Sequence, residues 1–179
     1  MLNKLLFKLS AGLPCRLIDL DTGPYLERYY VGSVLGVTFY LHRFVSPDSE
    51  RHMHNHPWGW GRALVLSGGY VEESVHDICP QAGPSGCILN RRFVKWWNRV
   101  DGNHFHRISN ARPGTWTLFF HSPRVDVDGL PIHSSQRAKG WGFLETADSE
   151  LTIFRPYPSA ARRWWVNAPK GRGAGRAEL

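Results

Sequence analysis

Residues 52–70 read H-M-H-N-H-P-W-G-W-G-R-A-L-V-L-S-G-G-Y. Three of the nine histidines, His52, His54 and His56, stand at alternate positions here, and an apolar run follows them up to a Gly-Gly pair. Side chains two residues apart on an extended strand lie on one face. We therefore expect His54 and His56 to direct both imidazoles to a common point, as two ligands of a metal ion, with His52 at the rim.

A second histidine pair lies further along the chain. Residues 101–110 read D-G-N-H-F-H-R-I-S-N, so that His104 and His106 also share a face. Two histidine strands separated by a hairpin region can lie side by side in an antiparallel sheet, with their ligands directed at one ion. The sequence thus predicts a metal site formed by His54, His56 and a ligand from the second pair, and the place of His106 in its sequence motif selects that residue. For His104 we expect a fourth ligand, a proton-transfer group or a purely structural residue.

The turn-forming residues indicate many short strands. The 179 residues include 18 Gly and 12 Pro, and turn signals recur about every ten residues, as in an antiparallel sandwich or barrel. We predict single strands at residues 36–45, 62–71 and 91–100, the second of them bent at Gly68-Gly69. The expected fold is all-β, an antiparallel jelly-roll β-barrel.

Helical periodicity is confined to the ends of the chain. Leu2, Leu5 and Leu9 recur at helical spacing, so residues 1–14 are expected to form a short amphipathic helix. Residues 15–157 are assigned to the β-barrel. Residues 158–179 are basic and lose periodicity, which predicts a flexible C-terminal tail.

The histidine motifs resemble those of the cupin superfamily, whose fold is a jelly-roll barrel. The first cupin motif is matched by His54-x-His56 and Gly68, and the second by His106-x-x-x-Asn110. The acidic position of the first motif falls at Gly61, so the usual carboxylate ligand is missing. The chain is similar to small uncharacterised cupin-like proteins of bacteria and phages in four segments: Tyr40–Phe44, His54–Trp58, Thr117–Phe120 and Trp141–Phe143.

The resemblance implies a mononuclear metal centre inside the barrel. Imidazole ligands suit transition metals, and some cupins, such as bacterial thiol dioxygenases, hold iron with three histidines and no acid. We therefore expect a divalent metal ion, Fe2+ in the first place and Zn2+ or Mn2+ as alternatives. Three neutral imidazoles leave the charge of the ion uncompensated, which favours an anionic ligand.

Three functions are compatible with this resemblance. The leading hypothesis is a non-haem Fe(II) dioxygenase or hydroxylase acting on a small anionic substrate. The alternatives are a Zn- or Mn-dependent isomerase or hydrolase, and a non-catalytic binding or assembly module, for example in a phage particle. The sequence leaves open whether the protein is an enzyme.

Several residues near the histidines are candidates for substrate contacts and catalysis. Arg62 and Arg107 could each bind a carboxylate or phosphate through two parallel hydrogen bonds; the alternative for both is a solvated surface position. Trp58 directly follows the histidines and is expected to stack on a ligand or to fill the core. Tyr70 and Glu72 are candidate acid-base groups.

Composition limits the partners. The formal net charge is +7, and the Arg162-Arg163-Trp164-Trp165 run resembles single-strand nucleic-acid contacts, although packing beside a solvated tail is preferred, so nucleic-acid binding is not expected. No segment approaches the roughly 18 apolar residues of a membrane span. Three cysteines without a C-x-x-C pair fit a reducing compartment. We expect a cytoplasmic protein, or a virion component in the phage case, that binds a small molecule and forms either a monomer or a homo-oligomer.

Overall fold

The structure, a computed structural model, describes residues 1–20, 23–46, 52–75, 89–102, 104–123, 142–147, 151–156 and 163–179. Its first elements are α1 (Leu2–Ser10), β1 (Cys15–Leu20), β2 (Gly23–Val34), β3 (Val37–Phe44), β4 (Met53–His54), β5 (Gly61–Ser67) and β6 (Tyr70–Val75). The remaining ones are β7 (Leu89–Val94), β8 (Trp97–Val100), β9 (Phe105–Ala111), β10 (Thr115–His121), β11 (Gly142–Ala147), β12 (Leu151–Pro156) and the 3-10 turns η2 (Trp164–Val166) and η3 (Gly171–Gly173).

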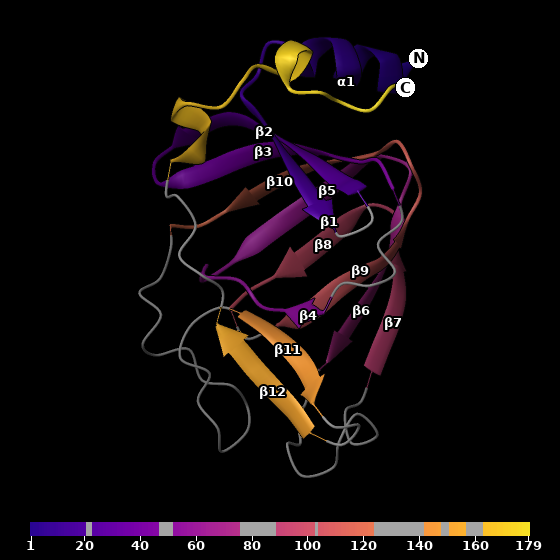
Figure 1. Cartoon of the computed structure of the whole chain (residues 1–179), viewed down its shortest axis with the longest axis vertical. Coiled ribbons are helices and arrows are strands. Elements are labelled where there is room, and N and C mark those ends of the chain that lie inside the picture. Colours follow the sequence, from indigo (N-terminus) through magenta and orange to yellow (C-terminus); the bar gives the residue numbers. More distant parts are fainter. Residues whose placement is uncertain are drawn as a thin grey trace.

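The strands form two six-stranded antiparallel sheets (Figure 1). One sheet has the order β1-β2-β3-β10-β5-β8, and the other has the order β12-β11-β4-β9-β6-β7. Strands that follow one another in the chain are often in different sheets, as in a jelly roll. The predicted all-β class with an antiparallel jelly-roll arrangement of strands is confirmed.

Two of the crossings between the sheets lie within stretches that the sequence pattern predicts as single strands. β5 pairs with β10, whereas β6, which follows after Gly68-Gly69, pairs with β9 in the other sheet. Both glycines have positive φ, and a Cβ on Gly68 would lie 2.3 Å from Thr115 Oγ1. The expectation of one bent strand at residues 62–71 is therefore wrong, because these residues form two strands that turn a corner through backbone only glycine adopts easily.

A second crossing follows between β7 and β8. β7 pairs with β6 in one sheet and β8 pairs with β5 in the other, with Lys95 and Trp96 at the corner. The single strand expected at residues 91–100 is likewise two strands. Alternation of side chains could not reveal either corner, because the apolar pattern continues across both.

The core lies between the sheets and beneath the terminal segments. One cluster of buried residues includes Tyr25, Phe44 and Tyr70, and another includes Tyr40 and Phe119. A third, with Tyr29 and Trp116, packs on the outer face of the first sheet against apolar residues of α1. The first two clusters form the walls around the histidines.

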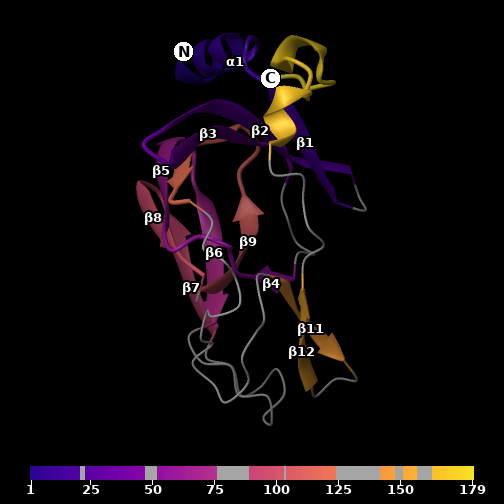
Figure 2. The same cartoon turned by 90° about the vertical axis from the view of Figure 1, so that its left-hand side faces the viewer.

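The two ends of the chain lie together over the outer face of the first sheet (Figures 1 and 2). Arg43 donates hydrogen bonds to the carbonyl oxygens of Ala177 and Glu178, and the Ala177 N–H donates to the carboxylate of Glu27. Arg176 lies over the ring of Phe7 in α1, with 3.7 Å between its guanidinium carbon and the ring centroid. These contacts give the backbone at Ala177 and Glu178 partners on β2 and β3, and the flexibility expected for residues 158–179 stays a prediction.

Within the described residues, no helix is both long and apolar enough to cross a membrane. The composition predicts loops at residues 77–90 and 123–140, and most of both segments lies outside the described residues.

Candidate metal centre

Three histidines converge on one side of the interface between the sheets. His54 on β4 is the direct antiparallel partner of His106 on β9, and His56 follows two residues after His54. The ring centroids are 5.0 Å apart for His54 and His56, 5.2 Å for His54 and His106, and 5.1 Å for His56 and His106. The structure thus brings together the three residues that the spacing of the histidines selected.

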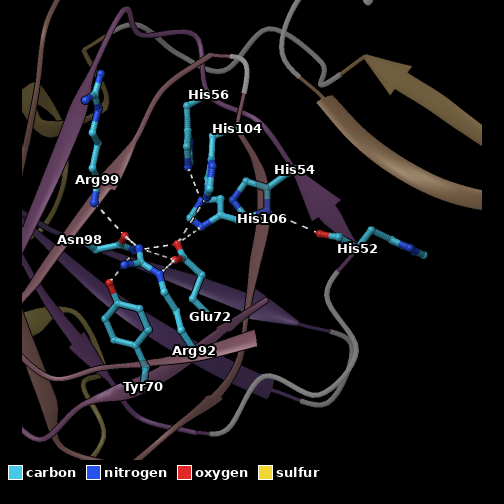
Figure 3. Close-up of polar contacts among 10 residues, drawn as sticks. All are labelled: His52, His54, His56, Tyr70, Glu72, Arg92, Asn98, Arg99, His104 and His106. Carbon is cyan, nitrogen blue, oxygen red and sulfur yellow. Dashed lines mark hydrogen bonds and ion pairs between the residues drawn. The ribbon is translucent and has the colours of Figure 1, made fainter. Parts of the chain in front are cut away.

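A buried carboxylate holds the central histidine of this group (Figure 3). The Nδ1 atom of His106 lies 2.7 Å from Oε1 of Glu72, a fully buried residue of β6. Glu72 and His106 are diagonal neighbours across the β6–β9 pair, with side chains on the same face. With its Nδ1–H donating to Glu72, His106 presents Nε2 as an acceptor, and this atom lies 2.8 Å from Nε2 of His56.

Glu72 is held in its ionised form by several donors. Asn98 Nδ2 donates to Oε1 at 2.6 Å and Arg92 Nε donates to Oε2 at 2.8 Å. Burial alone would raise the pKa of Glu72, but the contacts with His104, His106 and Asn98 outweigh it and lower the pKa below its usual range. A permanent negative charge therefore stands behind His106 at neutral pH.

The donor set fits a divalent transition metal. One ligand nitrogen of each of His54, His56 and His106 lies within 4.8 Å of the others, and a carboxylate behind a ligating imidazole is a common arrangement that fixes its tautomer. Two ligand nitrogens about 2.05 Å from one ion and 90° apart are separated by about 2.9 Å, close to the 2.8 Å between the Nε2 atoms of His56 and His106. No ion is part of the structure, and the residues present could hold one.

A second group of donors shares His106 but lies deeper. Glu72, His104 and His106 also place ligand atoms within 4.8 Å of one another, with His104 Nε2 at 3.8 Å from Glu72 Oε1. Glu72 is already bonded to Arg92 and Asn98, and neither it nor His104 lines the cavity described next. The cavity-lining set of three histidines is therefore the better candidate.

A cavity of about 70 Å³ lies between the sheets in front of the histidines. On this measure a single water needs roughly 10–15 Å³, so the space accommodates several waters or a small ligand. Sixteen described residues line it: Tyr25, Leu26, Arg28, His42, Phe44, His54, His56, Trp58, Ala63, Tyr70, Asn98, Val100, His106, Ile108, Thr117 and Phe119. The walls are mostly apolar, which strengthens electrostatic interactions inside.

Trp58 and Tyr70, two further candidates from the sequence, both line this cavity. Trp58 stacks on His56, with centroids 4.5 Å apart, and on His121 at 4.1 Å, so it orients a histidine as well as filling space. The hydroxyl of Tyr70 accepts a hydrogen bond from Asn98 at 3.1 Å. Burial raises the pKa of Tyr70 above its usual range, and its hydroxyl therefore remains protonated at neutral pH.

The structure does not bring Arg62 or Arg107 to the cavity. Side chains alternate along a strand, and since Ala63 and His106 face inward, their neighbours Arg62 and Arg107 face outward. Arg62 lies over the ring of Trp60, with its guanidinium carbon 5.7 Å from the centroid, and Arg107 Nε donates to Glu73 at 2.7 Å. The expectation that these two arginines contact a substrate is corrected by this alternation.

His52 precedes the group at its edge. Its carbonyl oxygen lies 3.5 Å from Nδ1 of His54 (Figure 3), and its side chain is exposed. This agrees with the position at the rim that the alternating histidines predicted.

Sequence reasoning missed the inner polar residues. Glu72 was considered only as an acid-base group, and its contact with His106 depends on the pairing of β6 with β9, which a single sequence does not reveal. Arg28 and His42 also line the cavity, and the sequence pattern singles out neither of them as a site residue. Only the Tyr40–Phe44 motif, which includes His42, could have drawn attention to this wall.

Three solved structures of similar fold are KdgF from Halomonas sp., Fe(II)-HppE and a recombinant oxalate oxidase. KdgF from Halomonas sp. is 16% identical, with 60% of this chain and 88% of that chain covered at a TM-score of 0.43. Fe(II)-HppE is 11% identical, with 63% and 57% covered at 0.45, and a recombinant oxalate oxidase is 17% identical, with 74% and 55% covered at 0.38. These neighbours are cupin-fold proteins. At these identities and TM-scores the likeness concerns the fold and carries no argument about reaction, metal or substrate.

No protein-family profile matches this sequence. No curated protein matches it either.

Proposed function

We propose that this protein binds one divalent metal ion through His54, His56 and His106 and acts as a non-haem Fe(II) dioxygenase or hydroxylase on a small anionic substrate. The observation that carries the proposal is the ring of three imidazoles at 5.0–5.2 Å from one another, open to a cavity and fixed from behind by Glu72. The proposed ligand set keeps the predicted absence of a carboxylate ligand, because Glu72 acts through His106.

Fe2+ is proposed as the resident ion because the histidine motifs resemble those of cupins that hold iron with three histidines, and Zn2+ and Mn2+ are the alternatives. When bound, a ferrous ion supplies the capacity to activate O2, which no protein side chain provides.

The surrounding residues have roles that follow from their positions. His106 is kept as an acceptor at Nε2 by its bond to Glu72, and Trp58 holds the plane of His56. We propose that the Tyr70 hydroxyl donates or accepts hydrogen bonds in the cavity and does not ionise. His104, 5.3 Å from His106 between centroids and with its Nε2 3.8 Å from Oε1 of Glu72, is proposed to help position the buried carboxylate behind His106.

Metal content tests this proposal. Untagged protein, reconstituted anaerobically with Fe2+, Mn2+ and Zn2+ in turn, is expected to retain about one ion per chain by plasma mass spectrometry. The His54→Ala/His56→Ala variant is expected to lose it, whereas His104→Ala retains it, because His104 belongs to the deeper group. Oxygen consumption by the ferrous protein with small organic acids then tests the reaction class.

Two results would contradict the proposal. Retention of metal by His54→Ala/His56→Ala with loss in His104→Ala would move the ion to the deeper group. No metal in the wild type with any of the three ions would leave the histidines structural and favour a binding or assembly module. The cytoplasmic location and homo-oligomer formation stay predictions, and no finding supports a place in a virion.

A further inference from the structure

The outer face of the first sheet is covered over only part of its width. Over β2 and β3, apolar residues of α1 and of the C-terminal segment pack on a cluster that includes Tyr29 and Leu41. β8, the edge strand next to β5, lies away from α1 and from the C-terminal 3-10 turns (Figure 2). The outer face of β8 and of the adjoining part of β5 therefore lies outside this terminal cover.

Side chains of β5 and β8 alternate between the cavity and this outer face. Ala63 and Asn98 line the cavity, so the residues before and after them point outward. The outward residues are matched across the two strands, since Leu64 pairs directly with Trp97. We call this surface the Trp97 face, and together with adjoining aromatic residues it consists of Trp60, Arg62, Leu64, Trp97, Arg99 and Phe120.

Indole rings are exposed on and beside the Trp97 face. Trp97 is 49% exposed, and Trp96, at the corner between β7 and β8, is 69% exposed. The Trp96 carbonyl oxygen accepts a hydrogen bond from the N–H of Val65 on β5 at 2.8 Å, so the corner adjoins this face. Trp97 and Trp60 both pack against Phe120, with centroids 6.0 and 6.2 Å apart. Such a group of exposed rings indicates a contact surface, because single exposed apolar residues are common but contiguous ones are not.

The charges on this surface have one sign. The guanidinium carbon of Arg62 lies 5.7 Å from the ring centroid of Trp60. The ammonium of Lys95 lies 5.6 Å from the ring centroid of the residue that follows it. Arg99 adds a third cation, which is exposed, whereas the described strands β5, β8 and β10 contain no Asp or Glu, and Asp101 comes after the end of β8. Strands with three cations beside them and no acid complement an anionic partner.

A single-stranded nucleic acid matches this arrangement of rings and charges. Each nucleotide offers one flat base and one negative phosphate, and unpaired bases stack on aromatic side chains beside a basic surface. The surface described above offers three indoles beside three cations. We propose that the Trp97 face and the adjoining corner bind single-stranded nucleic acid, with bases stacked on the indoles and phosphates paired with Arg62, Lys95 and Arg99.

This surface differs from the basic aromatic run near the C-terminus. In the run Arg162–Trp165, the ring of Trp165 stacks on Tyr30 with centroids 4.3 Å apart and planes 3° apart. Trp164 stacks on Tyr40, with centroids 6.0 Å apart. Both indoles of the run are thus engaged in packing. The proposal therefore departs from the expectation of no nucleic-acid binding, which was drawn from that run.

Fluorescence anisotropy with a labelled oligonucleotide tests this proposal. The probe is a fluorescein-labelled strand of about twelve thymidines, a length within the site sizes of other single-strand binders. The same strand annealed to its complement hides the bases from stacking, and a polyuronate offers negative charge without flat rings. The full chain is titrated with and without metal, since the Trp97 face is outside the metal site, and the thermal midpoint of each variant is recorded.

Loss of the exposed indoles should weaken binding most. In Trp96→Ala/Trp97→Ala the Kd for the single strand is expected to rise about 30-fold or more, because two stacking partners are lost. Trp96→Ala alone should raise this Kd about fivefold. The duplex should bind more weakly than the single strand, and binding of the polyuronate should not depend on the indoles.

The contribution of the arginines should appear in the salt dependence of binding. Three phosphate contacts give a slope of log K against log salt concentration of about −2, and Arg62→Gln/Arg99→Gln should bring the slope to about −0.7. Arg16→Gln/Arg172→Gln removes equal charge from exposed arginines on β1 and η3. This matched control should keep the wild-type slope, because neither residue belongs to the Trp97 face.

Three results of these titrations would overturn the inference: no saturable binding of the single strand, equal affinity for the duplex, or equal losses in the two double arginine variants. If Trp96→Ala/Trp97→Ala fails to fold, an unchanged Kd in Trp96→Ala has the same consequence.

Two further results would assign the Trp97 face to another partner and also overturn the inference. A polyuronate that displaces the probe at equal charge, and whose own binding is lost in Trp96→Ala/Trp97→Ala, would identify an acidic polysaccharide as the ligand. A wild-type dimer by light scattering that becomes a monomer in the same variant would identify an interface between copies of this chain. None of these readouts depends on bound metal, so this inference and the proposed function fail separately.

Discussion

Two buried glutamates, one on the outer face of the first sheet and one in the second sheet, have different partners. Glu27 on β2 and Glu72 on β6 are both fully buried. Glu27 is bonded to Arg43, with Nη1 at 3.1 Å from Oε1, and it accepts hydrogen bonds from the Tyr29 hydroxyl at 2.5 Å and the Ala177 N–H at 2.8 Å. Glu72 instead meets an imidazole that opens onto a cavity.

The difference separates a structural charge pair from a functional one. The partner of Glu27 is a guanidinium that is always charged, and the chain ends close over both groups. The partner of Glu72 is a histidine whose second nitrogen faces the cavity, so the carboxylate can tune what that nitrogen binds. Removal of a Glu27 contact should therefore affect folding, whereas removal of the Glu72 charge should affect ligand binding.

The largest effect is expected for Arg43→Met. This change leaves the Glu27 carboxylate buried without its cation, and breaking such a pair costs about 3–5 kcal/mol of unfolding free energy. Urea denaturation followed by tryptophan fluorescence measures the loss. The double variant Glu27→Gln/Arg43→Met should recover part of it, because no isolated charge is then buried; equal stability of both variants would show that the pair is not the source of the loss.

The second prediction concerns Glu72→Gln, which tests the other buried glutamate. The amide keeps the shape but not the charge that holds His106, so metal affinity should fall about 10–100-fold, as measured by competition with a chelating dye. Glu73→Gln is the matched control, since Glu73 pairs with Arg107 and Arg91 outside the cavity. A similar loss of affinity in both variants would contradict the role of Glu72.

The stability of the protein should depend on pH through Cys15, which lies near Glu27. Burial, and next the nearby charge of Glu27, raise the pKa of the Cys15 thiol from its ordinary 9.0 to about 12. Below pH 9 the thiol is neutral in both states and its contribution to stability is complete; between about pH 9 and about pH 12 the unfolded chain ionises first, so stability is lost as pH rises.

Urea midpoints measured over this alkaline range in wild type and Cys15→Ala provide the test. The wild type should lose stability more steeply with rising pH than Cys15→Ala, and parallel curves would show that the thiol ionises equally in both states. Metal affinity should be the same in the wild type and in Cys15→Ala.

The smallest effect is expected for Arg107→Ala. Arg107 is about one third exposed, and partly exposed ion pairs contribute about 0–1 kcal/mol. Chemical denaturation should detect little change, and metal affinity should equal that of the wild type. A marked loss of metal affinity would show that Arg107 contributes to the site despite facing outward.

The histidine pattern by itself predicted much of the candidate site. Alternation placed His54 and His56 together, and a second alternating pair offered His106 on a strand that could lie alongside. The structure pairs His54 with His106 directly. This part could be predicted because histidines two residues apart stay close in space, although β4 ends at His54 and β9 begins at Phe105, so that His56 and His104 lie just outside the strands.

The turns and the polar surroundings could not be read in the same way. The corner at Gly68-Gly69 sends β6 into the second sheet, and only this crossing brings Glu72 to His106. Likewise, the basic composition of the C-terminal residues predicts disorder, yet Arg43 and Glu27 bind their backbone. Both outcomes depend on partners far apart in the sequence.

The sequence alone thus determined the class of fold and which histidines share a face, because repeated spacing and turn residues act over a few positions. Only the tertiary structure decided that Glu72 stands behind His106, that Arg28 rather than Arg62 or Arg107 faces the cavity, and that the chain ends cover Glu27. The physical reason is that buried charges must find partners, and which partners they find depends on how strands pair and cross between sheets.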